Sequence, residues 1–317
     1  MVYIKNSELE KLPYISGFPA ENQTLHGCPY FDEDRKRYLI QYFNEKGDII
    51  SLYAIPVKGF YYSKSKKDIE IDFFTEFFNI MYCDYSYTFA ANLIYEILND
   101  ISNLSAIFEK YFIFLNHFST DSSIYKPVLV RTEIEYFFGV IRSLYDLLQN
   151  LIKLFVKNYM KIDLPNSYAQ MFDNNEKIKS NWPKLPKRLV SYYNSTAKLF
   201  FACRDIRDKI YHYGATNNFL VYFEEGFGID QELLSFSEFN IWPQHKIKKN
   251  NIVSLLAMFA YITKNIIQNM NELALVLLEE FKPQKRFISA DYMIFFRGPC
   301  TEHLNKLDKY LDEQWLK

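Results

Sequence analysis

One apolar stripe in the middle of the chain constrains the fold more than any other feature. Its residues recur at steps of three or four, the spacing that brings side chains to one face of an α-helix, and they continue for about seven turns. The opposite face is polar and includes Arg142, Asp146 and Gln149. The stripe consists of Ile134, Phe137, Phe138, Ile141, Leu144, Tyr145, Leu148, Leu151, Ile152, Phe155 and Tyr159. The pattern predicts a helix over 125–160, with Pro127 near its first turn.

Three further segments have the same helical spacing of apolar residues. They predict long helices over about 88–117, 187–213 and 249–281. Gly214 directly follows the second of these segments, where a glycine is typical of a helix C-cap. A polar, proline-containing loop over 161–186 precedes that helix. Four long helices joined by loops favour a mainly α fold, an up-and-down helical bundle with small β-hairpin decorations.

The decorations are two predicted hairpins and a short helix. Residues 37–43 and 49–55 flank a turn that contains Gly47, a pattern typical of a β-hairpin. A second hairpin is predicted over 218–239, as an insertion between two of the long helices. Residues 72–82 predict a short helix.

These elements divide the chain into three expected regions. Residues 1–85 form an N-terminal mixed α/β region, and residues 86–281 form the helical bundle with its inserted hairpin. Residues 282–317 form a C-terminal tail, in which an amphipathic pattern near 301–315 predicts one short helix.

The composition excludes several classes of protein. Nine glycines, without a GxGxxG or GxxxxGK[ST] pattern, argue against a glycine-rich phosphate loop. Four cysteines, at positions 28, 83, 203 and 300, form no close pair, so neither a zinc site nor a disulfide scaffold is expected. The 37 Lys and Arg residues are balanced by 38 Asp and Glu residues. That balance excludes a uniformly basic surface for nucleic acid and leaves room for a local basic face.

The chain also lacks the apolar segments of exported and membrane proteins. Its N-terminal residues contain no apolar signal-peptide core. The longest apolar run, residues 252–263, stops at Lys264 and is too short to span a bilayer. We therefore expect no membrane partner and a cytoplasmic location.

The segment over 201–214 is the most informative for function. It contains Arg207 and His212 separated by four residues, with Asp208 directly after the arginine. The motif falls near the end of the helix predicted over 187–213. It resembles the mark of the HEPN superfamily (higher eukaryotes and prokaryotes nucleotide-binding), an Arg-x4–6-His pattern in a helical bundle.

The resemblance covers roughly residues 86–281 and implies an HEPN-like bundle. Many members of that family are RNA endonucleases that need no metal or other cofactor, in toxin, antiphage or CRISPR-linked systems. They typically act as homodimers in which two motifs meet across the interface. RNA, a second copy of the chain, and an antitoxin or regulatory partner are therefore the partners that the resemblance implies.

The chemistry of RNA cleavage explains the residue types in this motif. An imidazole moves protons near neutral pH, so we expect His212 to be the acid or base. A guanidinium can bind a phosphate through two hydrogen bonds, so we expect Arg207 to hold the phosphate. Asp208 lies four residues before His212, on the same helix face, and could bond its imidazole. Arg204 extends the same row of side chains by one turn.

Basic residues are frequent in the segment that leads into the motif. The segment from Lys177 to Lys209 contains nine basic residues and only two acidic ones. This excess of positive charge indicates either contact with an RNA backbone or a solvated loop. Four tyrosines could stack a base or pack in the core: Tyr192, Tyr193, Tyr211 and Tyr213. The candidate RNA contacts are Arg204, Lys209, Tyr211, Lys187 and Arg188.

Two alternatives to a nuclease remain open at the level of the sequence. The first is a non-catalytic helical module that binds a nucleotide, an RNA or a protein partner. The second is an interaction protein that dimerises through the 125–160 stripe or the 249–281 helix. A second match to the motif, Arg297 with His303, contains Gly298 and lies in the tail, so we do not expect it to function.

Overall fold

The computed structural model describes residues 29–43, 49–54, 59–64, 67–85, 90–118, 126–179, 184–213, 220–234, 236–282 and 292–315. The described chain is mainly helical and carries small sheets, so the mainly α prediction is confirmed. No helix in this part of the chain combines the length and the apolar character that a membrane span requires.

Contacts group the chain into two compact units, each built from two separate stretches. The first unit combines Met1–Tyr95 with Asn271–Glu302, and the second combines Glu96–Met270 with His303–Lys317. This grouping differs from the three consecutive regions expected from the sequence. The difference arises because a strand in the tail pairs with the N-terminal strands, so that the tail contributes to both units.

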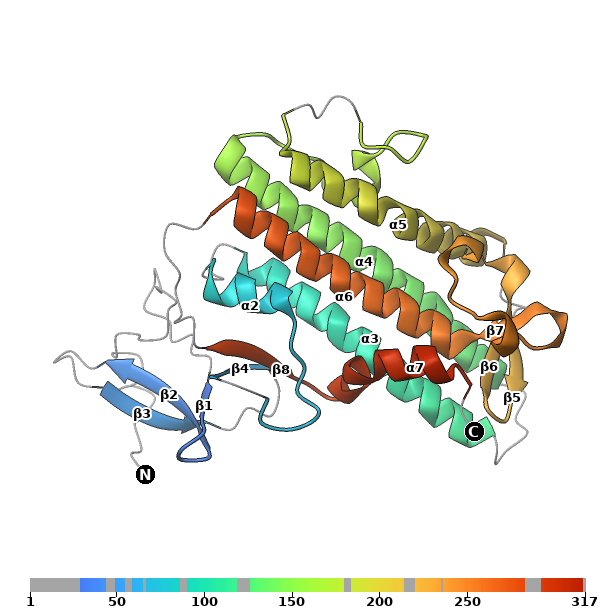
Figure 1. The fold of residues 1–317 in the computed structure, drawn as a ribbon, viewed down its shortest axis with the longest axis horizontal. Helices are drawn as coiled ribbons and strands as arrows, with labels where there is room; N and C mark the ends of the chain where they lie inside the picture. The colour runs from blue at the N-terminus through green and yellow to red at the C-terminus, as the bar shows by residue number, and fades with distance from the viewer. Residues whose placement is uncertain are drawn as a thin grey trace. The chain divides into compact units, whose positions relative to one another are not determined.

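Long helices make up most of the second unit, and successive helices run in alternating directions (Figure 1). The predicted helices over 88–117, 125–160 and 187–213 are confirmed within three residues at each end. Every member of the predicted apolar stripe except Tyr159 is buried, so this stripe forms much of the core of the unit. The helices are α3 (Ala91–Phe118), α4 (Lys126–Met160), α5 (Lys187–Tyr213), α6 (Leu255–Glu280) and α7 (Leu307–Glu313), of which α3 and α6 begin or end in the first unit.

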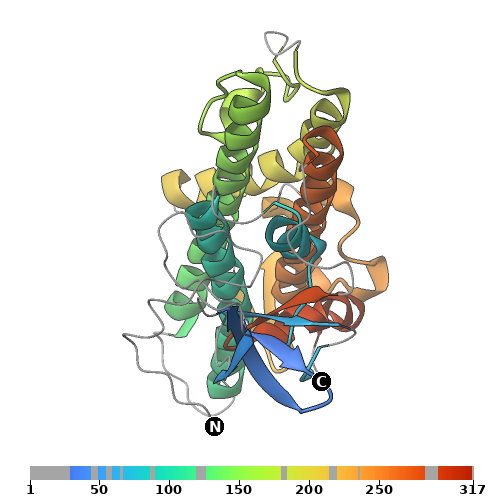
Figure 2. The ribbon, with the colours of Figure 1, turned by 90° about the vertical axis from the view of Figure 1, so that its left-hand side faces the viewer.

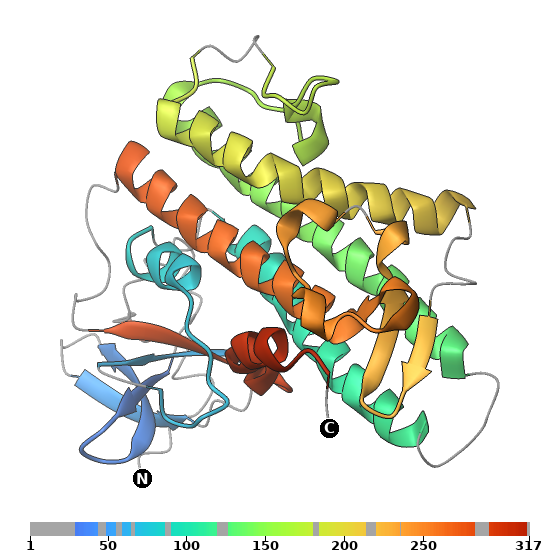
Figure 3. The same ribbon diagram turned by 45° about the vertical axis from the view of Figure 1, so that its right-hand side comes forward.

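The predicted hairpin over 218–239 is part of a three-stranded sheet. Figure 3 shows this sheet beside the start of α6. Its third strand comes from residues that the sequence assigned to the 249–281 helix, so that helix begins six residues later than predicted. Asn250 and Asn251 adopt positive φ angles of 62° and 55°, which an α-helix does not allow. The strands are β5 (Leu220–Phe223), β6 (Gly226–Asp230) and β7 (Ile252–Ser254).

The first unit is organised around a five-stranded sheet (Figure 2). The predicted hairpin is confirmed as an antiparallel pair in which Ile40 lies opposite Leu52. The strand order is β3-β2-β1-β4-β8, so a tail strand that the sequence did not predict completes one edge. The elements are β1 (Tyr30–Asp32), β2 (Arg37–Phe43), β3 (Ile49–Ala54), β4 (Gly59–Ser63), α2 (Glu76–Cys83) and β8 (Met293–Arg297).

Short 3-10 turns connect these elements. The predicted tail helix is divided into one such turn followed by α7. The turns are η2 (Tyr168–Met171), η4 (Gln231–Leu233), η5 (Ser237–Phe239), η6 (Gln244–Lys246), η7 (Lys249–Asn251) and η8 (Thr301–Lys306).

Candidate functional site

The last turns of α5 present the motif at the edge of a buried face. Phe200, Cys203, Ile206 and Ile210 recur every three or four residues and are buried. This spacing fixes the rotation of α5 against the core. Arg204 directly follows a buried position, so it lies at the border between the core and solvent.

A small pocket opens between α4 and α5 next to the motif. The pocket is small and partly open to solvent, and both helices contribute to its wall. The wall combines aromatic and aliphatic side chains with three guanidinium groups. The lining residues are Phe138, Ile141, Arg142 and Tyr145 of α4, and Phe200, Cys203, Arg204 and Arg207 of α5.

Arg142 is the most constrained of the three arginines. Its Nε lies 3.0 Å from a carboxylate oxygen of Asp146, and its Nη2 donates to Ser167 Oγ at 2.7 Å. Its guanidinium also lies over the ring of Phe200, 5.1 Å from the ring centre. The third nitrogen, Nη1, is buried, and no atom in the described part of the chain accepts a hydrogen bond from it.

The electrostatic surroundings of Arg142 oppose its charge. Burial lowers the pKa of this guanidinium, and the nearby charges of Arg207 and Arg204 lower it further. Asp146, and more weakly Asp208, act in the opposite direction and favour the charged form. Arginine stays protonated under all ordinary conditions, so the pocket concentrates positive charge that is only partly compensated.

Asp208 lies beside both arginines of the motif region. One of its oxygens lies 3.2 Å from Arg207 Nη2 and the other 3.6 Å from Arg204 Nε. All three side chains are about one third to one half exposed. The predicted contact between Asp208 and the His212 imidazole stays a prediction, because the side chain of His212 lies outside the described residues.

The predicted RNA contacts do not all gather at this pocket. Arg204 lines it, whereas Lys209 is exposed and pairs with Asp205 at 2.8 Å. Lys187 and Arg188 are exposed in the first turn of α5. They lie about twenty residues before the motif, which corresponds to about 30 Å along the helix. The side chain of Tyr211, like the C-cap expected at position 214, lies outside the described residues.

Two tyrosines named as candidates for base stacking belong to the core. Tyr192 and Tyr193 are both fully buried, so neither can stack on a base without unfolding the helix. Tyr193 donates a hydrogen bond of 2.7 Å to Gln149 of α4. The stacking interpretation of these two residues is therefore wrong, and the core interpretation is correct.

Sequence reasoning missed Arg142, which lies in the middle of α4. The helical spacing assigned Arg142 and Gln149 to a polar, outward face. In the structure α5 and residues 165–168 contact this face, and Gln149 is completely buried. The only signal in the sequence was the spacing of four residues between Arg142 and Asp146, which does not reveal the helix that packs beside them.

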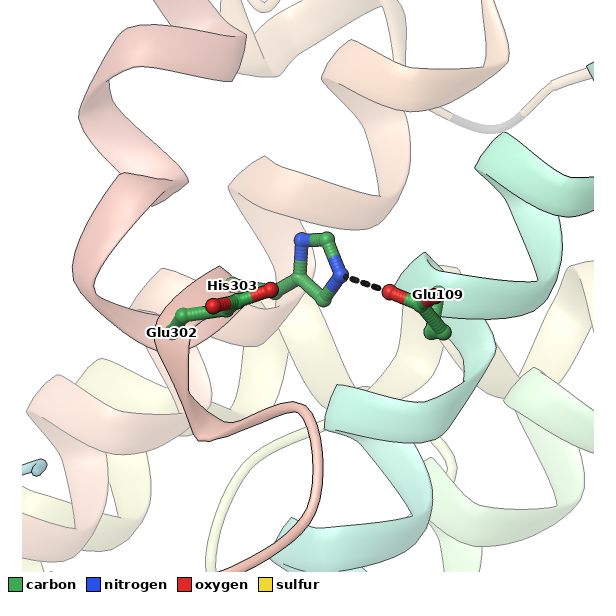
Figure 4. A group of neighbouring side chains, drawn as sticks. All are labelled: Glu109, Glu302 and His303. Atoms are coloured by element: carbon green, nitrogen blue, oxygen red, sulfur yellow. Dashed lines mark hydrogen bonds and ion pairs between the residues drawn. The ribbon is translucent and has the colours of Figure 1, made fainter. Parts of the chain in front are cut away.

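Both residues of the second match to the motif make structural contacts. Arg297 lies in β8 and binds Asp72 through two hydrogen bonds, of 2.6 and 2.7 Å. His303 is buried; its Nε2 lies 2.8 Å from Glu109, as Figure 4 shows, and its Nδ1 lies 2.7 Å from the hydroxyl of Tyr310. Each residue therefore makes structural contacts, and the expectation that this match does not function stays a prediction.

The sequence matches no protein-family model, and neither a curated protein nor a solved structure matches the chain. The resemblance to the HEPN superfamily therefore rests on the motif of Arg207 and His212 and on its position near the end of α5.

Proposed function

We propose that the protein is a metal-independent RNA endonuclease of the HEPN type. The observation that supports this proposal most strongly is the pocket between α4 and α5, where Arg204 and Arg207 meet a third guanidinium. A pocket of this kind suits a phosphate group, because guanidinium groups bind its oxygens through charge-assisted hydrogen bonds. The motif histidine follows Arg207 within two turns of the same helix.

The proposed reaction is an internal attack by the RNA itself. The ribose 2′-oxygen forms a bond to phosphorus, and the bond from phosphorus to the 5′-oxygen of the next nucleotide breaks. His212 takes the proton of the 2′-hydroxyl, and the leaving 5′-oxygen receives a proton from an acid. In a homodimer the second copy's protonated His212 supplies that acid. The products are a 2′,3′-cyclic phosphate, or the 3′-phosphate after hydrolysis, and a 5′-hydroxyl.

Arg207 stabilises the transition state in this scheme. Negative charge accumulates on the non-bridging phosphate oxygens as the 2′-oxygen attacks. The side chain is 32% exposed, so it is accessible to RNA while remaining partly shielded from water. Its present ion pair with Asp208 holds the guanidinium at the border of the pocket, and a phosphate would compete with that carboxylate.

The resemblance also suggests a biological setting. We include in the proposal a cytoplasmic role as a toxin or in antiphage defence, with an antitoxin or another regulatory partner.

End-group analysis tests the proposed chemistry. Wild-type protein in excess EDTA is incubated with an RNA pool, and we expect cleavage that leaves cyclic or 3′-phosphate ends and 5′-hydroxyl ends. A substrate with a 2′-deoxy substitution at the mapped cleavage position should resist cleavage there, because it lacks the nucleophile. Dependence on added metal, or cleavage at the deoxy position, would contradict the mechanism.

One observation favours a second candidate function. Asp208 is shared between Arg204 and Arg207, so the motif region contains an internal ion-pair network in the absence of ligand. A non-catalytic module that binds nucleotide or RNA would also be consistent with this arrangement. Binding of RNA that weakens in the Arg207→Ala variant, without cleavage of any RNA by the wild type, would favour this second function.

A further inference from the structure

We propose that Arg142 of α4 is the third ligand, together with Arg204 and Arg207, of the RNA phosphate that binds in the pocket between α4 and α5. This inference rests on the proposed function, because it assigns the pocket to the same RNA substrate. It adds a binding residue that lies outside the Arg-x4-His motif, 65 positions before Arg207.

The balance of charge around the pocket favours a singly charged anion. Three guanidinium groups line it, and the carboxylates of Asp146 and Asp208 oppose them. These five side chains together carry a formal charge of +1, three positive charges against two negative ones. A phosphodiester carries one negative charge, so a backbone phosphate would complete the balance in a partly buried place, where a charge pair is screened less than at the surface.

Hydrogen bonding at Arg142 leads to the same conclusion. A buried polar group without a hydrogen-bond partner is destabilising, because it has lost its hydrogen bonds to water. Within the described residues, Nη1 of Arg142 is such a group, although the same side chain makes two good contacts through its other nitrogens. An anionic oxygen bound in the pocket would supply an acceptor for this nitrogen.

The contacts of Arg142 also fix its position before any ligand arrives. Asp146 and Ser167 hold two of its nitrogens, and Phe200 supports the plane of the guanidinium. Asp146 is itself fixed, because its other oxygen accepts a hydrogen bond of 2.8 Å from the backbone of Tyr168. A side chain that is already ordered loses little conformational entropy on binding, which strengthens the interaction.

The size and walls of the pocket limit what it can hold. The enclosed part of the pocket is about the size of a single water molecule, so only an oxygen of a phosphate, and not a whole nucleotide, enters it. Phe138 and Ile141 form an apolar wall, so the polar part of any ligand has to face the arginines. The occupant that fits this chemistry is a phosphate group within a larger chain.

Binding of a non-cleavable RNA tests this inference separately from catalysis. The probe is a fluorescent 2′-O-methyl oligoribonucleotide, whose affinity is measured by anisotropy over a series of KCl concentrations. We expect Arg142→Gln to weaken binding about tenfold, and to reduce the slope of log affinity against log salt by about 0.7, the value for one phosphate contact on a single strand. The matched control is Arg35→Gln, an exposed arginine of the first unit, which should bind as the wild type does.

A second variant keeps the test decisive if Arg142→Gln folds poorly. Arg142→Lys keeps the charge and loses the planar fork, so we expect several-fold weaker binding with an unchanged salt slope. Thermal melts of both variants report their folding. Inorganic phosphate should raise the melting temperature of the wild type more than chloride of equal ionic strength does, and should lose this effect in Arg142→Lys.

The outcomes separate this inference from the proposed function. If Arg142→Gln and Arg142→Lys both bind RNA with wild-type affinity and slope, the inference is wrong even where the wild type cleaves RNA. If the oligonucleotide binds in an Arg142-dependent way and no RNA is cleaved, the phosphate site stands and the nuclease function is wrong. An absence of any stabilisation by phosphate, together with unchanged RNA binding, would also overturn the inference.

Discussion

At the scale of single residues, the first unit contains a buried carboxylate, Asp72, whose charge requires compensation by its neighbours. Its side chain is completely buried and accepts hydrogen bonds from Arg297 and from the hydroxyl of Tyr61, at 2.7 Å. Asp68 lies 2.9 Å from the same guanidinium. Neighbouring carboxylates raise the pKa of Arg297 above its ordinary value, with Asp72 as the largest cause. The cluster connects the tail strand β8 to the N-terminal part of the chain.

Removal of the arginine leaves a buried carboxylate without its counter-charge. We expect Arg297→Met to lower the free energy of unfolding by about 3–5 kcal/mol, as measured by urea denaturation. The control is Arg35→Met, whose exposed ion pair with Asp32 should change stability by less than about 1 kcal/mol. Equal stability of the two variants would contradict the role assigned to the cluster.

The second motif match is also explained at this scale. Arg297 and His303 satisfy the spacing of the family pattern, and the glycine and proline between them predicted that the match would not function. The structure gives the physical reason, because each side chain already binds a buried partner. Spacing alone does not distinguish this match from Arg207 with His212, so the proposal relies on the helical context of the latter pair.

At the scale of elements, the predicted helices were correct where apolar spacing alone defines them. The helix predicted over 125–160 is α4, because its stripe is long and its ends are marked by prolines. The start of α6 was wrong, because Ile252, Val253 and Ser254 are as compatible with a strand as with a helix. Pairing with β6, which is distant in sequence, decides between the two.

The polar face of α4 could not be interpreted from its own sequence. Gln149 was assigned to solvent, yet it is buried, accepts from Tyr193 of α5, and donates to the backbone oxygen of Pro165 at 2.8 Å. The same covered face contains Arg142. Part of a polar helix face is buried here by a neighbouring element, and the sequence of the helix alone does not show which part.

The hydrogen bond between the hydroxyl of Tyr193 and Gln149 tests how α5 is fixed on α4. We expect Tyr193→Phe to lower the free energy of unfolding by about 1–3 kcal/mol, because it leaves the buried amide oxygen of Gln149 without this donor. Tyr95→Phe is the matched control, since Tyr95 is an exposed side chain that should change little. Urea denaturation of both variants measures the difference.

At the scale of the whole molecule, the sequence predicted the class of fold and most elements but not their grouping. The helical bundle and both hairpins follow from local patterns. The grouping into two units depends on β8, whose five residues pair with β4 across more than two hundred positions of sequence. Pairing between residues so distant in sequence has no local sequence pattern, so the sequence predicted the tail as a separate region.

The proposed mechanism requires two copies of the chain, and sedimentation tests this requirement. We expect the purified protein to sediment at twice its monomer mass of 37.9 kDa at micromolar concentration. The Arg207→Ala variant should also sediment as a dimer if the motif contributes to chemistry and not to assembly. A wild-type monomer would contradict the arrangement in which the second copy's His212 supplies the acid.

The central claim is that Arg207 and His212 together cleave RNA. The most direct measurement compares the cleavage rate in excess EDTA for wild type, Arg207→Ala and His212→Ala, with Arg35→Ala and His245→Ala as matched controls on exposed residues. We predict a loss of at least about a hundredfold in each motif variant, the usual contribution of a general acid or base or of charge stabilisation, and wild-type rates in both controls. Cleavage that survives both motif substitutions in folded protein would contradict the claim.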